Sequence, residues 1–392
     1  MNGRWDARQQ GHIGGNPRSV TSGSGSPGPT GMEDDMILAA TLERRRFRIA
    51  LGSIAALALA VAAACRNTPV DRPGASEKAR PSAEVPKQEA SLPQQIADVM
   101  AQLNGGIHPG FRFAHAKGMV LTGTFTPAKG AASISRAAHL KGPTVSVTAR
   151  LSDGTGVPQI NDDNANASPR GMAIRFALPS GASTDIVANS HNGFFVGTGD
   201  DFLAFLKAVA ATKPDSPHPS PIEQFLGSHP RALKVVIDSK PLPTSFATLG
   251  FFGNNAFVFV DSTGTKRAGR YQILPVAGIH HLDSTAAVKL SPNYLFDELT
   301  RRIARGPIKY RLFVQLANPG DQTNDGSIVW PDDRKRVELG TISLTKIAPN
   351  NDELQRSLTF NPIFITDGIQ LSDDPFVPLR SAVYALSVAH RR

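Results

Sequence analysis

Between residues 118 and 317 the sequence contains a series of short apolar runs that are rich in β-branched residues and bounded by turn-forming residues. These runs are GMVLTGTFTPA, TVSVTARLSDG, GMAIRFAL, NAFVFVDSTG, YQILPVA and KYRLFVQLA. Branched side chains favour a pleated backbone, and frequent turns let neighbouring runs pair in antiparallel fashion. So many strands in one chain predict a substantial antiparallel sheet or barrel.

Helical patterns lie between and after these runs. They are QQIADVMAQL at 94–103, DDFLAFLKAVAAT at 200–212, LFDELTRRIARG at 295–306 and PLRSAVYALSVAHRR at 378–392. The order lacks the regular strand–helix alternation of a parallel sheet, so the pattern is typical of an α+β fold. We expect one folded domain over residues 94–392.

The N-terminal part of the chain has a different composition. Residues 1–48 are polar, rich in glycine and serine, and end in the basic sequence RRRFR, which predicts a disordered basic segment. Residues 49–65 form an apolar run behind these arginines, the arrangement of an export signal, of twin-arginine type, or of a membrane anchor. Residues 66–93 are proline-rich and predict a linker. The folded domain is therefore expected in the periplasm or outside the cytoplasm, either released or anchored.

Charge and cysteine content exclude several classes of function. The chain has 42 Lys+Arg against 33 Asp+Glu, but part of this excess belongs to the targeting segment, so we do not expect nucleic-acid binding. Its single cysteine, Cys65, cannot form an intrachain disulfide, a thiolate metal cluster or a Cys-x-x-Cys-His attachment. Any prosthetic group must therefore be held without covalent bonds.

Each candidate chemical residue is ambiguous by itself. His115 lies in FRFAHAKG, Ser152 ends an apolar strand in TARLSDG, and Asn189 follows another in DIVANSHNGFF. A histidine, serine or asparagine in such a place is more often structural. Arg380 and Tyr384 are four residues apart, so on a helix their side chains share a face. There is no dinucleotide fingerprint and no nucleophile elbow.

Taken in order, these segments resemble the haem-dependent catalase family, and most closely its short catalase-related peroxidase branch. The longer matches are RFAHAKG at 112–118, TARLSDG at 148–154, SPRGMAIRF at 168–176, DIVANS at 185–190 and RSAVYA at 380–385. Shorter ones are YRLFVQ at 310–315, VWP at 329–331, FNP at 360–362 and GI at 368–369. The resemblance implies an antiparallel β-barrel of the haem catalase type with surrounding and C-terminal helices.

The same resemblance implies a noncovalent haem b and a role for several residues. Tyr384 is implied as the axial ligand of the iron, as known for tyrosine in catalases. On the opposite face His115 is implied as the general acid/base, with Asn189 holding the peroxide and Ser152 orienting the histidine. The remaining implied cofactor contacts are Arg112, Arg150 and Arg391 to the propionates, Phe195 and Phe202 in the pocket wall, and Arg380 beside the tyrosine phenolate.

The expected function is reduction of H₂O₂ or an organic hydroperoxide with a small organic electron donor. Ser190, His191 and Asn192 depart from the family pattern after Asn189, and the sequence stops at Arg392 without the family's C-terminal extension. Efficient H₂O₂ disproportionation and NADPH binding are therefore not expected. Two alternatives stay open: a fatty-acid hydroperoxide isomerase similar to allene oxide synthase, and a nonenzymatic haem-binding protein.

Overall fold

A computed structural model describes residues 89–238, 241–283 and 290–391. The predicted basic segment 1–48, the apolar run 49–65 and all but the last five residues of the linker 66–93 lie outside the described residues. Among the residues that are described, no helix is both long enough and apolar enough to cross a bilayer.

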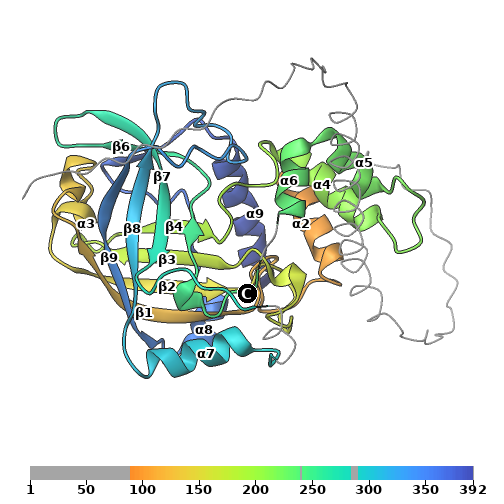
Figure 1. The fold of residues 1–392 in the computed structure, drawn as a ribbon, viewed down its shortest axis with the longest axis horizontal. Coiled ribbons are helices and arrows are strands. Elements are labelled where there is room, and N and C mark those ends of the chain that lie inside the picture. Colours follow the sequence, from red (N-terminus) through yellow and green to blue (C-terminus); the bar gives the residue numbers. More distant parts are fainter. Residues whose placement is uncertain (1–88, 239–240, 284–289, 392) are drawn as a thin grey trace, which may run out of the picture. The chain divides into compact units, whose positions relative to one another are not determined.

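The strands pair into a closed antiparallel barrel (Figure 1). Strands β1 to β4 are successive neighbours, β5 joins β4 to β7, and β8 pairs with both β7 and β9. Because β9 also pairs with β1, eight strands of the described chain form a ring, while β6 and β10 extend it beyond β7. The predicted α+β fold with an antiparallel barrel is confirmed.

The strands are β1 (Gly118–Pro127), β2 (Val145–Ser152), β3 (Gly171–Ala177), β4 (Ser183–Asn189), β5 (Phe251–Phe252), β6 (Phe257–Val260), β7 (Lys266–Pro275), β8 (Ile308–Leu316), β9 (Arg336–Ile347) and β10 (Ile369–Leu371). The α-helices are α2 (Leu92–Leu103), α3 (Ala138–Lys141), α4 (Gly199–Ala211), α5 (Pro221–Ser228), α6 (Pro230–Ile237), α7 (Tyr294–Ile303), α8 (Asn351–Ser357) and α9 (Phe376–Arg391). All six predicted strand runs therefore contain a strand.

Side chains from the inner face of the strands fill the barrel. The largest fully buried ones include Phe125, Phe176, Phe251, Phe259 and Tyr310, so the interior is a packed core and not a channel. The hydroxyl of Tyr310 donates to the carbonyl of Phe246 at 2.8 Å, which satisfies its one polar atom. A binding site must therefore lie outside the barrel interior.

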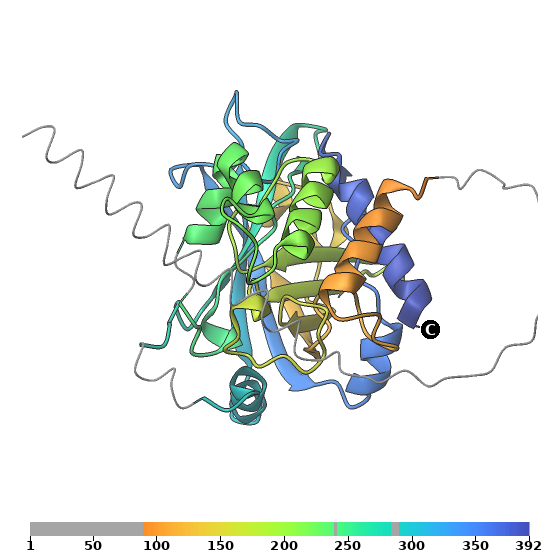
Figure 2. The same cartoon turned by 90° about the vertical axis from the view of Figure 1, so that its right-hand side faces the viewer.

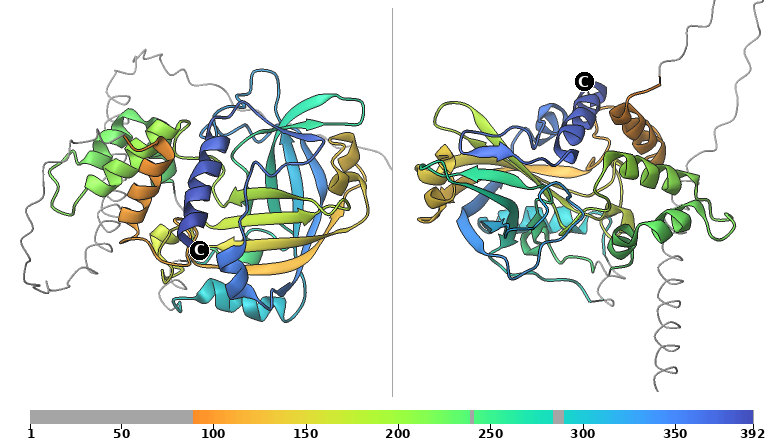
Figure 3. Two further views of the ribbon diagram at one scale, coloured as in Figure 1. Left: turned by 180° about the vertical axis from the view of Figure 1, so that it is seen from behind. Right: turned by 90° about the horizontal axis from the view of Figure 1, so that it is seen from above.

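Helices α2, α4 and α9 pack together beside strands β2 to β4 (Figures 2 and 3). Their shared core contains Ile96 of α2, Leu203 and Leu206 of α4, and Val383 of α9. Helix α2 begins at Leu92, two residues before the predicted boundary, because Pro93 is suited to a first turn that needs no N–H donor. Helix α2 contacts both α4 and α9, and α9 carries Arg380, Tyr384 and Arg391.

One buried histidine makes stability depend on pH. His139 of α3 is 1% exposed and packs 4.9 Å from the ring of Phe176, and burial lowers its pKa to about 4. Its pKa in the unfolded chain is about 6.5. As the pH falls through 6.5 the unfolded state gains the proton first, so stability is lost between about pH 7 and pH 4.

We expect His139→Phe to remove about 2 kcal/mol of the stability loss between pH 7 and pH 5, because it keeps an aromatic ring but cannot bind a proton. Urea denaturation of both proteins at the two pH values measures this difference. An equal loss of stability in wild type and variant contradicts the assignment.

Candidate active site

Three side-chain positions are brought into one row by strand register. Ser152 at the end of β2 faces Gly171 at the start of β3, and Gly171 faces Asn189 at the end of β4. Directly opposed residues of a sheet project to the same face. Residues separated by up to 37 positions in the sequence therefore share one small surface.

His115 is placed against this row by the loop that follows α2. A Cβ atom on Gly171 would lie 2.7 Å from the Nδ1 atom of His115 and 2.6 Å from the hydroxyl oxygen of Ser152, so only glycine leaves room for the ring. His115 has a positive φ of 57°, a strained conformation for a residue other than glycine. The surrounding contacts must therefore hold it.

The hydrogen bonds of His115 decide its protonation state. Its Nδ1 atom lies 2.8 Å from the carbonyl oxygen of Asp153 and 3.2 Å from the hydroxyl of Ser152. A carbonyl can only accept, so Nδ1 carries the proton and Nε2 carries a lone pair. Burial, followed by the charge of Arg150, lowers the pKa of His115 to about 4. The ring is therefore a neutral base near pH 7.

Asn189 is held by a turn at the end of β4. Its side-chain oxygen accepts the backbone N–H of His191 at 2.8 Å. This bond fixes the amide plane and leaves the amide NH₂ group as the donor that can meet a ligand.

A second group of residues comes from α9 and the loop before β6. The Nη2 atom of Arg380 donates to the hydroxyl oxygen of Tyr384 at 2.9 Å, as their four-residue spacing on a helix predicts. Arg380 also donates through Nη1 to the side-chain oxygen of Asn255, and Asn255 donates to Asp374 at 2.7 Å. A carboxylate is thus linked through an amide and a guanidinium to the phenol of Tyr384.

Both groups line one cavity. The centres of water-sized molecules can occupy about 250 Å³ of it, and His115, Ser152, Asn189, Arg380 and Tyr384 all face this space. Its other walls are mainly apolar and aromatic: Phe113, Met172, Phe194, Phe202, Phe252, Phe360, Phe376, Leu379 and Val383. The row that contains Ser152 and Asn189, the His115 ring, and the tyrosine hydroxyl that accepts from Arg380 therefore all line a single cavity.

Phe202 lies in this wall, whereas Phe195 lines a different hollow. Phe195 stacks on Phe205 with ring centroids 5.2 Å apart and lines a separate hollow beside α6. Its neighbour Phe194 lines the cavity instead and packs 5.4 Å from Phe202. The two residues lie in an irregular segment with bends, so no regular periodicity in the sequence distinguishes the two phenylalanines.

Three arginines gather at one end of the cavity. Arg112, Arg150 and Arg391 all line it. Burial, then the charges of Arg150 and Arg391, lowers the pKa of Arg112 to about 7, and burial with the charge of Arg391 lowers that of Arg150 to about 9. Concentrated positive charge in a buried place is favourable only beside an anion. The cavity is therefore built for a ligand with negative groups at this end.

Helix α8 and the loop after it hold this arginine cluster. The carbonyl oxygens of Gln355 and Leu358 accept from both Arg112 and Arg391, and the side-chain oxygen of Gln355 accepts from Arg150 at 2.6 Å. The C-terminal end of a helix carries partial negative charge, which suits cations. Sequence reasoning missed Gln355, because a single glutamine in a charged segment has no distinctive signal.

Comparison with known proteins gives the family. The family profile described as Catalase matches residues 70–392, which is more than half of the chain. The chain belongs to the catalase family. It is 35% identical over 302 residues to a catalase-related peroxidase of Mycolicibacterium paratuberculosis, a match that covers 76% of this chain and 94% of the relative. A catalase-related peroxidase of Synechococcus elongatus is 30% identical over 301 residues, covering 75% of this chain and 87% of that one.

Longer catalases match less closely. Catalase-1 of Arabidopsis thaliana is 25% identical over 300 residues, which cover 71% of this chain and 60% of that protein. The crystal structure of a fungal catalase has the same fold, with a TM-score of 0.60 at 19% identity, and the match covers 82% of this chain and 66% of that one. Of the proteins compared, the two catalase-related peroxidases have the higher sequence identity to this chain.

Catalases and their relatives are haem proteins, and the described residues of this catalase-family chain suit a haem. The arginine cluster suits two carboxylates, and the aromatic walls suit a flat apolar ring system. In addition, Asn254 lines the cavity, and its buried side-chain NH₂ has no hydrogen-bond partner among the described residues, as expected of a group that contacts a ligand.

We expect Arg112→Gln to weaken haem binding while leaving the haem-free protein as stable as wild type or more so. The substitution relieves repulsion between cations, and the two carbonyls that Arg112 meets still accept from Arg391. Haem titration and urea denaturation of the haem-free protein measure the two effects. Arg356→Gln on the exposed side of α8 is the control and should change neither. A haem-free variant clearly less stable than wild type contradicts the charge argument.

Proposed function

We propose that this protein is a haem peroxidase that reduces H₂O₂ or an organic hydroperoxide and takes the electrons from a small organic donor. One observation carries the proposal: a neutral His115 with a free Nε2 lone pair shares a cavity with the Arg380-supported hydroxyl of Tyr384. A protein that only binds haem needs an iron ligand such as Tyr384, but it does not need a base such as His115. The catalase-related peroxidases that match the chain support the same activity.

The cofactor is proposed to be haem b, bound without covalent bonds. Tyr384 would be the iron ligand, since Arg380 at 2.9 Å stabilises the phenolate that a ferric ion requires. The propionates would lie against Arg112, Arg150 and Arg391, with Phe202 in the wall. When bound, haem supplies the iron that accepts two oxidising equivalents from peroxide.

The residues of the chain supply the proton transfers and the orientation. His115 Nε2 takes the proton from the peroxide oxygen that approaches the cofactor and returns it to the oxygen that leaves, so that water or an alcohol departs. The NH₂ group of Asn189 donates to the peroxide and holds it in place. Ser152 and the carbonyl of Asp153 keep the His115 ring oriented.

The place of action is proposed from the sequence alone. The apolar run 49–65 behind RRRFR favours export to the periplasm or beyond, with or without an anchor in the membrane. Fractionation of the native host, with immunodetection of the protein, tests this proposal.

Steady-state assays test the function. With H₂O₂ and a dye as reductant, we expect dye oxidation to exceed oxygen evolution, because Ser190 to Asn192 depart from the catalase pattern. His115→Ala should slow peroxide cleavage by about 10²–10⁴-fold and Asn189→Ala by less, with haem retained in both. His280→Ala, at an exposed residue, is the control. Rapid oxygen evolution would indicate a catalase, whereas rearrangement of a fatty-acid hydroperoxide without a reductant would indicate an isomerase.

Tyr384→Phe tests the iron ligand. The variant keeps the ring but loses the oxygen, so most of the haem or the ferric spectrum of a phenolate complex should be lost. Tyr294→Phe is the matched control, because the hydroxyl of Tyr294 donates to the carbonyl of Pro243, outside the cavity lining. Absorption spectra of both variants after haem loading measure the effect. A wild-type spectrum in Tyr384→Phe would exclude Tyr384 as the iron ligand.

A further inference from the structure

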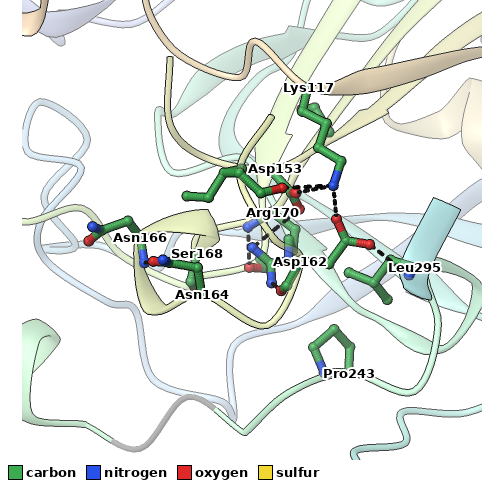
Figure 4. A network of polar contacts seen from close by, with 12 residues as sticks. Lys117, Asp153, Asp162, Asn164, Asn166, Ser168, Arg170, Pro243 and Leu295 are labelled. Carbon is green, nitrogen blue, oxygen red and sulfur yellow. Dashed lines mark hydrogen bonds and ion pairs between the residues drawn. The ribbon is translucent and has the colours of Figure 1, made fainter. Parts of the chain in front are cut away.

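Four charged side chains are buried behind the loop that carries His115. They are Lys117, Asp153, Asp162 and Arg170, and Figure 4 shows them facing one another. The side chains of Asp153 and Asp162 are 0% exposed, that of Arg170 is 3% exposed and that of Lys117 13%. We call these four residues the distal charge cluster.

Most of the distal charge cluster is tied to several parts of the fold. Asp162 accepts from Lys117 at 2.5 Å and, with its other oxygen, from the N–H of Leu295 in the first turn of α7 at 2.8 Å. Lys117 also donates to the carbonyl of Ile160, and Arg170 to that of Asp162. Each of these three residues therefore makes at least one hydrogen bond through its charged group, although Nε and Nη1 of Arg170 have no hydrogen-bond partner among the described residues.

Asp153 differs from the other three. Its carboxylate oxygens make no hydrogen bond within the described structure, although Arg170 Nη1 lies 3.3 Å from one and Lys117 Nζ 4.0 Å from the other. Burial raises the pKa of this carboxyl to about 7 against the opposing charge of Arg170. An ion pair of this geometry repays little of its desolvation cost. Stability therefore does not explain why an aspartate occupies this position.

The backbone of Asp153 connects the cluster to His115. Its N–H donates to the carbonyl of Lys117 at 3.1 Å, and its own carbonyl accepts from Nδ1 of His115 at 2.8 Å. Lys117 and Arg170 attract the side chain from the opposite side. The carbonyl of Asp153 keeps the proton on Nδ1 of His115. Asp153 itself is held by the hydrogen bond of its N–H and by the attraction of its carboxylate to two cations.

A residue of the cluster also contacts Ser190, which follows Asn189. The N–H of Arg170 donates to the hydroxyl of Ser190 at 3.0 Å, and the N–H of Ser190 donates back to the carbonyl of Arg170 at 2.8 Å. Ser190 follows Asn189 and is one of the departures from the family pattern. The backbone of Arg170 is therefore hydrogen-bonded to the residue that follows Asn189.

We propose that Asp153 is a positioning residue for His115: attraction to Lys117 and Arg170 holds its carbonyl oxygen against Nδ1, which keeps the proton on Nδ1 and the lone pair on Nε2. The proposal rests on the proposed function, in which Nε2 is the base that meets peroxide. Besides Lys117 and Arg170, the titratable groups that face Asp153 are Asp162 and Tyr294.

Cyanide binding to the ferric, haem-loaded protein tests the proposal without turnover. Hydrogen cyanide gives its proton to a base when the anion binds iron, so the association rate reports on Nε2. Asp153→Asn keeps the shape of the side chain but removes its attraction to the two cations. We expect association to slow by 10- to 100-fold, as for other small displacements of a catalytic group, with haem content unchanged. A rate within twofold of wild type overturns the proposal.

Asp162→Asn is the matched control. It removes the same charge from the same cluster, but the carbonyl of Asp162 accepts from Arg170 and not from His115. Its loss of the bonds to Lys117 and Leu295 should lower thermal stability more than Asp153→Asn does, while cyanide association stays within about twofold of wild type. Equal slowing in both variants would mean that the cluster acts only through its net charge, and Asp153 would not be a positioning residue.

Proton NMR of the wild-type cyanide complex gives a measurement that does not depend on a variant folding. The Nδ1 proton of His115 should be present and exchange slowly with solvent, and in Asp153→Asn it should exchange at least about tenfold faster. A wild-type ring that carries no proton on Nδ1 also overturns the proposal. His115→Ala distinguishes failure of the proposed function from failure of the positioning role. If His115→Ala leaves cyanide association unchanged, the proposed function fails. If His115→Ala slows association while Asp153→Asn has a normal rate, only the positioning role is rejected.

Discussion

The antiparallel register of strands β2, β3 and β4 is the constraint on which the site depends. It opposes Ser152, Gly171 and Asn189 in one row, and the missing Cβ of Gly171 gives the His115 ring its place. A shift of one residue in either strand pair would turn these side chains to the opposite face. Closure of the ring by β8 and β9 leaves little freedom for such a shift, so the barrel determines the distal geometry without containing the cavity.

Buried charge is used in two different ways on the two sides of His115. Arg112, Arg150 and Arg391 form a positive group, and burial with mutual repulsion lowers the pKa of Arg112 and of Arg150, which suits a cofactor with carboxylates. The distal charge cluster behind the ring contains two cations and two carboxylates, and it holds backbone instead of ligand. The three arginines suit the anionic groups of a ligand, whereas the distal charge cluster contains its own carboxylates, Asp153 and Asp162, beside its two cations.

A chain of hydrogen bonds supports Tyr384 in the same cavity. Tyr384 is linked through Arg380 and Asn255 to Asp374, so a buried carboxylate balances the guanidinium that faces the phenol oxygen. Loops before β6 and α9 provide Asn255 and Asp374, while α9 provides the other two residues. The helix can therefore present Tyr384 in a fixed orientation, which suits its proposed role as iron ligand.

Local pattern determined much of this protein by itself: the β-branched runs predicted six of the strands, the spacing of Arg380 and Tyr384 predicted their contact, and ordered motifs predicted the family. Strand β9 was not predicted, because charged residues on its exposed face interrupt the apolar pattern. Only the tertiary structure decided that Phe194 and not Phe195 faces the cavity, and that Gln355, Asn255 and Asp153 support the site. These contacts join residues that are distant in the chain. Which residues meet depends on strand register and on the burial of charged groups, and neither can be predicted from the local spacing of residues.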